Sequence, residues 1–330
     1  MDHLAFVTDA FATHPPPGSV CREPPSSARP AVRRAAAIAL AADQGGVVSR
    51  AQLATVDVDR RMITREVRAG RWRRHGRHTI AVHTGTLEVL ALRHRALWEV
   101  GQGIAQLDGV SALQALGLRG FEEERVFVSV KHNHNTAPVE GVVIKKVIRR
   151  VPGELLEGGP RRTRPEVAAI RAAAWAVSDR QAALILVMAV QQRLTTGRRL
   201  VAASVTVRRR ARRAFIHQIA RDIADGAHSL GELDFAVLCR SWGLPEPSRQ
   251  VLRRGPRGRI YLDVGWEERN WAVEIDGAHH FWGLGPPDDT FRQNELVIAG
   301  DRMLRITLVG LRLNPELCGD QLRRALRVDV

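Results

Sequence analysis

The chain has 330 residues, of which 45% are hydrophobic and 26% charged, and its formal net charge is +15. This balance excludes a disordered or fibrous protein and predicts a soluble globular protein of two or three domains. The three cysteines are scattered and form no CxxC pair, so neither a zinc site nor a disulfide framework is indicated, and we expect a reducing cytoplasm. The longest apolar run, 182–190, is too short to span a bilayer, so no membrane partner is expected.

The charge is divided unevenly along the chain. Residues 1–228 hold 36 basic and 20 acidic residues, a net of +16, whereas residues 229–330 hold 14 basic and 15 acidic residues, a net of −1. Nearly all basic residues are arginine, which suits bidentate contacts with phosphate and guanine. The basic part therefore predicts nucleic acid as a partner, and the alternative is a solvated basic surface.

Residues 15–30 are rich in proline and serine, so residues 1–30 are predicted to be a disordered linker, and residues 31–85 then show helical patterns. An alanine-rich helix starts at Ala31 and stops at two glycines, 45 and 46. Ser49 and Gln52 form a capping box for a short helix, and Asp59 caps a third helix that ends at Gly70. A glycine-centred turn and an apolar strand follow. Three helices and then a hairpin are the order of a winged helix-turn-helix.

The third predicted helix has a divided surface. Met62, Ile63 and Val67 face the core, and the opposite face is polar. Such a helix enters the major groove, where arginine reads guanine edges, while arginines on the wing follow phosphates. A solvated basic face and a protein-binding face are the alternatives. The DNA-binding candidates are Arg61, Thr64, Arg65 and Arg68 on the helix and Arg71, Arg73, Arg74 and Arg77 on the wing.

Residues 45–83, GGVVSRAQLATVDVDRRMITREVRAGRWRRHGRHTIAVH, resemble the N-terminal winged-helix domain of AbiEi-type antitoxins. The resemblance continues weakly to about residue 225. It implies a member of a type IV toxin–antitoxin system that represses its own promoter, with a cognate toxin as a further candidate partner.

The middle region, 86–228, predicts a mixed α/β unit. Helices are expected over 87–100, 110–116, 165–175 and 180–193, and 142–148 is expected to pair with a half-buried strand at 126–130. The KHNHN stretch at 131–135 fits a polar loop better than a metal site, because no third ligand cluster lies nearby. The basic run VRRRARRAF, 207–215, is expected on a helix, where phosphate contact and a solvated face are equally plausible.

Residues 229–330 predict a separate α/β domain. A helix starts at Ser229 with an apolar stripe that includes Val237 and Leu238, and residues 250–266 form a strand. If residues 267–270 form a loop closed by Trp266 and Trp271, Asp263 lies directly opposite Glu274. Asp276 then shares their face. Carboxylates so placed either are screened by water, as in an ordinary amphipathic hairpin, or hold a hard cation such as Mg²⁺.

The segments GELDF, YLDVGW, AVEIDGAHH and MLRITLVGL, at 231–235, 261–266, 272–280 and 303–311, resemble a domain family related to very-short-patch-repair (Vsr) endonucleases. The resemblance implies a PD-(D/E)XK fold and Mg²⁺-dependent DNA cleavage. It implies that Asp263 and Glu274 bind the metal and that Glu232 is the helix glutamate of the superfamily. Asp276 stands where many relatives have lysine, so His280 or His279 is expected to assist as general acid or base.

The sequence thus predicts a multidomain α+β and α/β protein with a winged helix-turn-helix, a mixed middle region and a restriction-endonuclease-like domain. Two functions follow: a winged-helix-targeted, Mg²⁺-dependent DNA endonuclease, or an antitoxin-like autoregulatory repressor whose nuclease-like tail is inactive. A third possibility is an interaction protein that grips a toxin with its tail. Arg292 and Arg305 are candidate phosphate contacts in the nuclease hypothesis.

Overall fold

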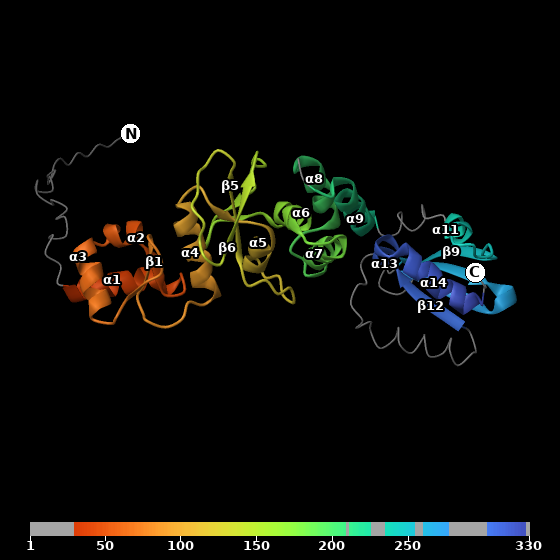
Figure 1. The fold of residues 1–330 in the computed structure, drawn as a ribbon, viewed down its shortest axis with the longest axis horizontal. Helices are drawn as coiled ribbons and strands as arrows, with labels where there is room; N and C mark the ends of the chain where they lie inside the picture. Colours follow the sequence, from red (N-terminus) through yellow and green to blue (C-terminus); the bar gives the residue numbers. More distant parts are fainter. Residues whose placement is uncertain (1–29, 209–210, 226–234, 255–259, 277–301, 328–330) are drawn as a thin grey trace, which may run out of the picture.

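The computed structural model describes residues 30–208, 211–225, 235–254, 260–276 and 302–327. Within these ranges the chain is a multidomain α+β protein with three separate sheets. Its lobes lie in a row: α1–α3 are at one end, the sheet that contains β5 and β6 comes next, α6–α9 follow, and the last sheet lies at the far end (Figure 1). None of the described helices combines the length and apolar character needed to cross a membrane.

The first lobe packs three helices on a small sheet with strand order β1-β3-β2. Its core includes Leu53, Ile63, Trp72 and Ile80. The predicted caps are confirmed: the Ser49 side chain accepts from the Gln52 backbone and Gln52 reaches back, while Asp59 accepts from the backbone of residue 62. The elements are α1 (Pro30–Ala42), β1 (Val47–Ser49), α2 (Arg50–Thr55), α3 (Arg60–Arg68), β2 (Arg73–Arg74) and β3 (Thr79–Ala81).

The second sheet has five strands in the order β6-β5-β4-β8-β7, with helix contacts to β5 from both α4 and α5. The predicted strand pair at 126–130 and 142–148 is confirmed and is parallel. The half-buried character expected for this strand is wrong, because Ser129 is fully buried like Val128 and Val130. The elements are α4 (Val89–Gly101), β4 (Gln106–Leu107), α5 (Gly109–Ala115), β5 (Val126–Lys131), β6 (Val142–Val147), β7 (Leu155–Leu156) and β8 (Arg162–Thr163).

Four helices continue the same hydrophobic core beyond the sheet: α6 (Pro165–Trp175), α7 (Asp179–Gln191), α8 (Gly197–Thr206) and α9 (Arg213–Asp225). The basic run at 207–215 was expected on one helix, and this is wrong: it spans the junction between α8 and α9. Arg212 in this junction has a positive φ of 56° and contacts Asp179 at 2.5 Å, so the junction is a turn held by an ion pair.

The C-terminal lobe is a four-stranded sheet in the order β12-β11-β10-β9, with its own core. Residues 250–266, expected as one strand, form two antiparallel strands instead, with the Gly-Pro-containing stretch 255–259 between them. Val237 was expected in the core but is 48% exposed; Phe235 and Cys239 are buried instead. The elements are α11 (Phe235–Ser241), β9 (Arg249–Arg254), β10 (Ile260–Trp266), a 3₁₀ turn (Glu267–Arg269), β11 (Trp271–Asp276), β12 (Arg302–Thr307), α13 (Leu308–Leu313) and α14 (Pro315–Leu326).

Helix α13 connects two cores. Leu308 and Leu311 pack in the core of the C-terminal lobe, whereas Val309 is buried in the core that α6–α9 share. On the same side, the Arg312 guanidinium lies 3.4 Å from the buried carboxylate of Asp222 on α9. Because β12 runs directly into α13, the C-terminal sheet is fastened to the helical lobe beside it.

Candidate functional site: a basic helix face and a row of carboxylates

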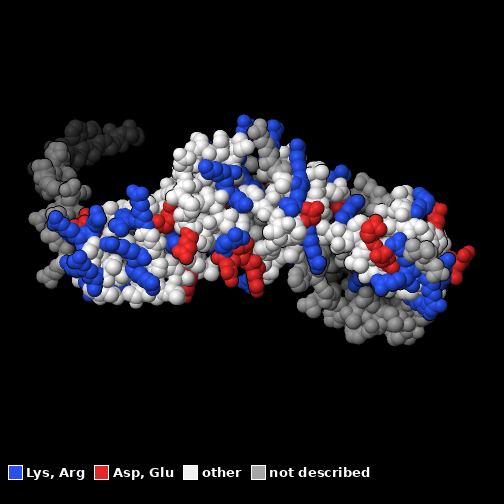
Figure 2. All heavy atoms as spheres, in the orientation of Figure 1, with Lys and Arg blue, Asp and Glu red and all other residues white. Residues whose placement is uncertain are grey.

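Helix α3 presents the polar face that its sequence predicts. Met62 and Ile63 are buried, and Arg61, Arg65 and Arg68 are exposed. These side chains, with Asp59 and Thr64 among others, line a shallow surface depression. Figure 2 shows basic side chains spread over the visible face of this lobe. The helix therefore offers several guanidinium groups to solvent on one side.

The β2–β3 hairpin reaches this face through one hydrogen bond. The Arg74 guanidinium donates to the Thr64 hydroxyl at 2.9 Å, and Thr64 in turn donates to the backbone carbonyl of residue 60. Thr64 is half-buried, so it supports Arg74 rather than standing fully open to a ligand. Arg73, Arg74 and Arg77 are all exposed, which agrees with their expected position beside the helix.

Arg71 was expected to contact phosphate, but its guanidinium donates to the buried Glu66 carboxylate at 2.6 Å. Glu66 also accepts from Arg34 of α1, so it joins α1, α3 and the start of the hairpin. The Arg71 hydrogen bond is the main reason that the pKa of Glu66 lies below its usual value, although burial opposes the shift. Arg71 is therefore occupied by an internal partner.

A second carboxylate fixes the turn of the hairpin. Glu99 on α4 accepts from the backbone N–H groups of residues 77, 78 and 79 and from the Thr79 hydroxyl, at 2.7–2.8 Å. Gly76 has φ 137°, and a Cβ there would lie 2.4 Å from the Glu99 carboxyl carbon, so the close approach requires glycine. Burial raises the pKa of Glu99, but these hydrogen bonds outweigh it and the net pKa is lowered. The hairpin is thus anchored to the next lobe.

The second candidate region is the hairpin of β10 and β11, whose predicted register is confirmed. Trp266 pairs with Trp271, and Asp263 lies directly opposite Glu274. Val264, Val273 and Ile275 point to the other side and are buried in the lobe's core. The loop closes because Asn270 adopts a left-handed conformation, which asparagine tolerates better than most residues.

Strand β12 places one more charged residue, Arg305, beside the pair formed by Asp263 and Glu274. It pairs with β11 in parallel, and Arg305 lies opposite Glu274, so Asp263, Glu274 and Arg305 follow one another across three strands. Asp276 is two residues from Glu274 and shares its face. The Arg305 Nε lies 2.5 Å from Asp276 Oδ2, and its Nη2 lies 3.8 Å from Glu274 Oε1. We call Asp263, Glu274, Asp276 and Arg305 the acidic row.

The carboxylate oxygens of Asp263 and Glu274 belong to adjacent strands and to one face, and this donor chemistry fits a hard divalent cation such as Mg²⁺. Within the described ranges, no group of three or more histidine, cysteine, aspartate or glutamate side chains is placed to hold a metal ion. Four other candidates, Glu232, His279, His280 and Arg292, lie outside the described residues.

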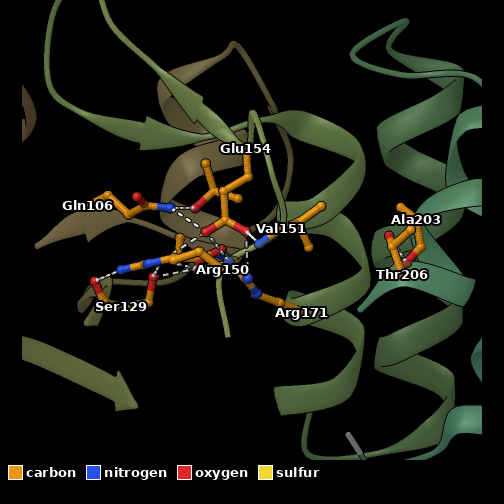
Figure 3. Close-up of polar contacts among 11 residues, drawn as sticks. Gln106, Ser129, Arg150, Val151, Glu154, Arg171, Ala203 and Thr206 are labelled. Atoms are coloured by element: carbon orange, nitrogen blue, oxygen red, sulfur yellow. Dashed lines mark hydrogen bonds and ion pairs between the residues drawn. The ribbon is translucent and has the colours of Figure 1, made fainter. Parts of the chain in front are cut away.

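A third polar group, which the sequence did not single out, is buried in the middle region (Figure 3). Arg171 of α6 donates to Asp108 at 2.7 Å and to Glu154 at 2.8 Å. Arg150 donates to Glu154 at 3.1 Å and to the Ser129 hydroxyl at 2.6 Å, and that hydroxyl donates to Asp108 at 2.5 Å. We call these five residues the buried cluster.

The buried cluster joins separate elements of the middle region. Gln106 donates to Glu154 and to the Thr163 hydroxyl, and Asp108 also caps the first residue of α5. Burial lowers the pKa of Arg171, but the nearby carboxylates outweigh it and raise the net pKa, so the guanidinium remains charged. A signal for Arg171 does exist in the sequence, because it interrupts the otherwise apolar helix AAIRAAAW.

No family model matches the chain, and no curated protein matches it. Among solved structures, the chain is similar to the crystal structure of the RV2827C protein from Mycobacterium tuberculosis. The identity is 18% and the TM-score is 0.37, with 60% of this chain and 78% of that chain covered. The proposals that follow therefore rest on the residues of this chain.

Proposed function

We propose that the protein binds duplex DNA through its first lobe and cleaves it through its C-terminal lobe. The first lobe is interpreted as a winged helix-turn-helix in which α3 is the recognition helix and the β2–β3 hairpin is the wing. The exposed candidates Arg61, Arg65 and Arg68 on α3 and the exposed Arg73, Arg74 and Arg77 on the hairpin support this interpretation. The sequence resemblance to AbiEi-type antitoxins points to the same DNA-binding use.

The C-terminal lobe is interpreted as a PD-(D/E)XK-type nuclease domain. The observation that carries this proposal is the pairing of Asp263 with Glu274 on one face of a sheet whose outer strand, β12, is parallel to its neighbour. A helix precedes this sheet and two follow it, where the sequence predicted one after the last strand, and this order is compatible with the proposed domain. Ordinary surface hairpins avoid like charges at directly opposed positions, so the pairing favours a functional site.

The residues of the row take distinct roles in the proposed reaction. Asp263 and Glu274 would hold Mg²⁺, which supplies an activated water and polarises the scissile phosphate when bound. Asp276 holds Arg305 at this face, and Arg305 is a candidate contact for a phosphate oxygen. Two candidates that lie outside the described residues also take part in the proposal. His280 is proposed as general acid or base, and Glu232 as a supporting carboxylate.

A cleavage assay with a metal series tests the proposal. We expect the full chain to nick supercoiled plasmid DNA with Mg²⁺ or Mn²⁺, and Asp263→Ala to lose this activity because one metal-binding carboxylate is gone. Glu268→Ala is the matched control, since Glu268 is an exposed carboxylate in the adjacent loop. Equal nicking by wild type and Asp263→Ala would show that the activity does not come from this site.

A second function, DNA-binding repression with an inactive tail and a toxin partner, is favoured by one observation. The Arg305 guanidinium already contacts Asp276 and Glu274, so part of the negative charge of the row is neutralised within the protein. Specific binding to the DNA upstream of its own gene, with no cleavage under any metal, would support this function instead.

A further inference from the structure

We propose that Arg305 is a built-in counter-ion that competes with a divalent cation for Glu274, while Asp276 serves to hold Arg305 rather than to bind the metal. This inference rests on the proposed metal site and adds to it the residue that sets the affinity for the cation.

The contacts of Arg305 are unequal. Its Nε is 2.5 Å from Asp276, a direct charge-assisted hydrogen bond, whereas its Nη2 is 3.8 Å from Glu274, beyond hydrogen-bonding distance. The carboxylates of Asp276 and Glu274 are nearly buried, with side chains 4% and 9% exposed, and the Arg305 side chain is 32% exposed. Arg305 is therefore held by Asp276 and partly accessible to solvent, and its contact with Glu274 is the longer of the two.

The position of Arg305 follows from the pairing of the strands. Glu274 has Asp263 on one side and Arg305 on the other, so the guanidinium stands next to the carboxylate pair in the same row. Asp276, two residues along the same strand, holds the Arg305 guanidinium in this position.

Two cations near one carboxylate repel each other. A metal ion bound to Glu274 would lie within a few ångströms of the Arg305 guanidinium, because that group is 3.8 Å from Glu274. Arg305 must therefore weaken cation binding, and it must reduce repulsion within the row when no cation is present. Removal of its charge is expected to have opposite effects on these two properties, and a merely structural residue would not behave in this way.

The test is a Mn²⁺ titration of the full chain, followed by electron paramagnetic resonance of unbound Mn²⁺, together with thermal unfolding in metal-free buffer. We expect Arg305→Gln to bind Mn²⁺ roughly tenfold more tightly than wild type, because a like charge is removed. We expect its melting temperature without metal to fall by a few degrees. Arg305→Lys, which keeps the charge, should resemble wild type in Mn²⁺ affinity.

Arg302→Gln is the matched control. Arg302 lies on the same strand and is exposed, but it is three residues from Arg305 and thus points to the opposite face of the sheet. It loses the same charge, so a general electrostatic effect would appear in both variants. We expect its Mn²⁺ affinity to stay within about twofold of wild type, since screening weakens charges on the far face.

The inference is overturned if Arg305→Gln binds Mn²⁺ no more tightly than wild type, including the case in which neither protein binds it. If the variant is unfolded without metal, we expect Mn²⁺ to restore a folding transition, and the absence of such rescue also overturns it. A wild-type protein that never cleaves DNA would overturn the proposed nuclease alone, because the binding titration does not depend on cleavage.

Discussion

The buried cluster and the acidic row both place a guanidinium between two carboxylates, but they do so in different ways. In the cluster, Arg171 makes direct contacts of 2.7 and 2.8 Å to its two partners, and its side chain is 5% exposed. In the row, Arg305 makes one contact of 2.5 Å and a second of 3.8 Å, with 32% exposure. The guanidinium of the cluster is thus bonded closely to both of its carboxylates, whereas that of the row is bonded closely to one of them.

This difference matches the roles that we propose for the two groups, structural for the cluster and functional for the row. Two carboxylates and two guanidiniums balance within the cluster, and hydrogen bonds from Ser129 and Gln106 complete it, so a ligand would gain nothing by entering. In the row, Glu274 pairs with Asp263 across the strands and lies 3.8 Å from Arg305, whose side chain is partly accessible to solvent. The exchangeable cation that we propose would bind beside Arg305 in this row.

The largest effect on the free energy of unfolding is expected when an arginine of the buried cluster is replaced. Arg171→Met keeps much of the side-chain volume but leaves the buried carboxylates of Asp108 and Glu154 short of one counter-charge. We expect the free energy of unfolding to fall by about 3–5 kcal/mol, the usual cost of breaking a buried ion pair on one side. Chemical denaturation followed by circular dichroism measures this loss.

Arg180→Met is the control for that experiment, because Arg180 lies exposed on α7 in the same helical lobe. It should change the unfolding free energy by less than about 0.5 kcal/mol. A similarly small change in Arg171→Met would mean that the cluster is not the closed network described above, and the contrast with the acidic row would lose its basis.

Local patterns predicted the register of the acidic hairpin but not the pairing of the strand beside it, β12. The loop length and the two tryptophans are enough to set the register of β10 and β11, so the pairing of Asp263 with Glu274 follows from sequence. The pairing of Arg305 with Glu274 does not, because β12 is parallel and is reached through a long connection. No turn rule sets the register of such a strand, and Arg305 was predicted only as a phosphate contact.

The sequence did not predict the buried cluster, and the reason is related. Asp108, Glu154 and Arg171 are far apart along the chain, and each charge by itself resembles a surface residue. Only the fold shows that they meet. Arg171 carried a partial signal, because alanines surround it on every side of its helix. In the first lobe, Glu66 carried a similar signal, since it follows buried Met62 and Ile63 at helical spacing.

A smaller effect on the free energy of unfolding is expected from His94, a buried base that shows no ion pair with a carboxylate among the described residues. His94 of α4 is 7% exposed, lies against the Trp98 ring and has a buried Nε2 without a hydrogen-bond partner among the described residues. Burial lowers the pKa of His94 to about 4, from the usual 6.5. The unfolded chain therefore binds a proton first as the pH falls, and stability that is fully present above pH 6.5 is lost progressively toward pH 4.

Because of this histidine, we expect the free energy of unfolding to fall by about 2 kcal/mol when the pH is lowered from 7 to 4.5. His75, whose pKa burial also lowers, contributes in the same range, so the measurement must compare wild type with His94→Leu. The lowered pKa values of Glu66 and Glu99 act below this window, since their usual value is 4.5. An unchanged pH slope in His94→Leu would show that His94 has the same pKa in the folded and the unfolded protein.

The smallest expected effect, on DNA-binding affinity, comes from removing a guanidinium that is exposed to solvent. Arg61 lies in the first turn of α3, exposed and beside the depression lined by this helix face. Unlike Arg171 or Arg305, it shows no ion pair among the contacts described for this lobe, so a phosphate or base can engage it without displacing a carboxylate. Arg61→Ala should weaken binding to a random-sequence duplex by about 1–2 kcal/mol, roughly 5- to 30-fold.

Fluorescence anisotropy over a salt series measures this loss and its origin. If Arg61 contacts phosphate, the slope of log affinity against log salt should become shallower by about one. Arg198→Ala is the control, because Arg198 is equally exposed but lies at the start of α8 in another lobe. Equal losses from both variants would indicate attraction by the net charge of the whole chain, and α3 would then have no special part in DNA binding.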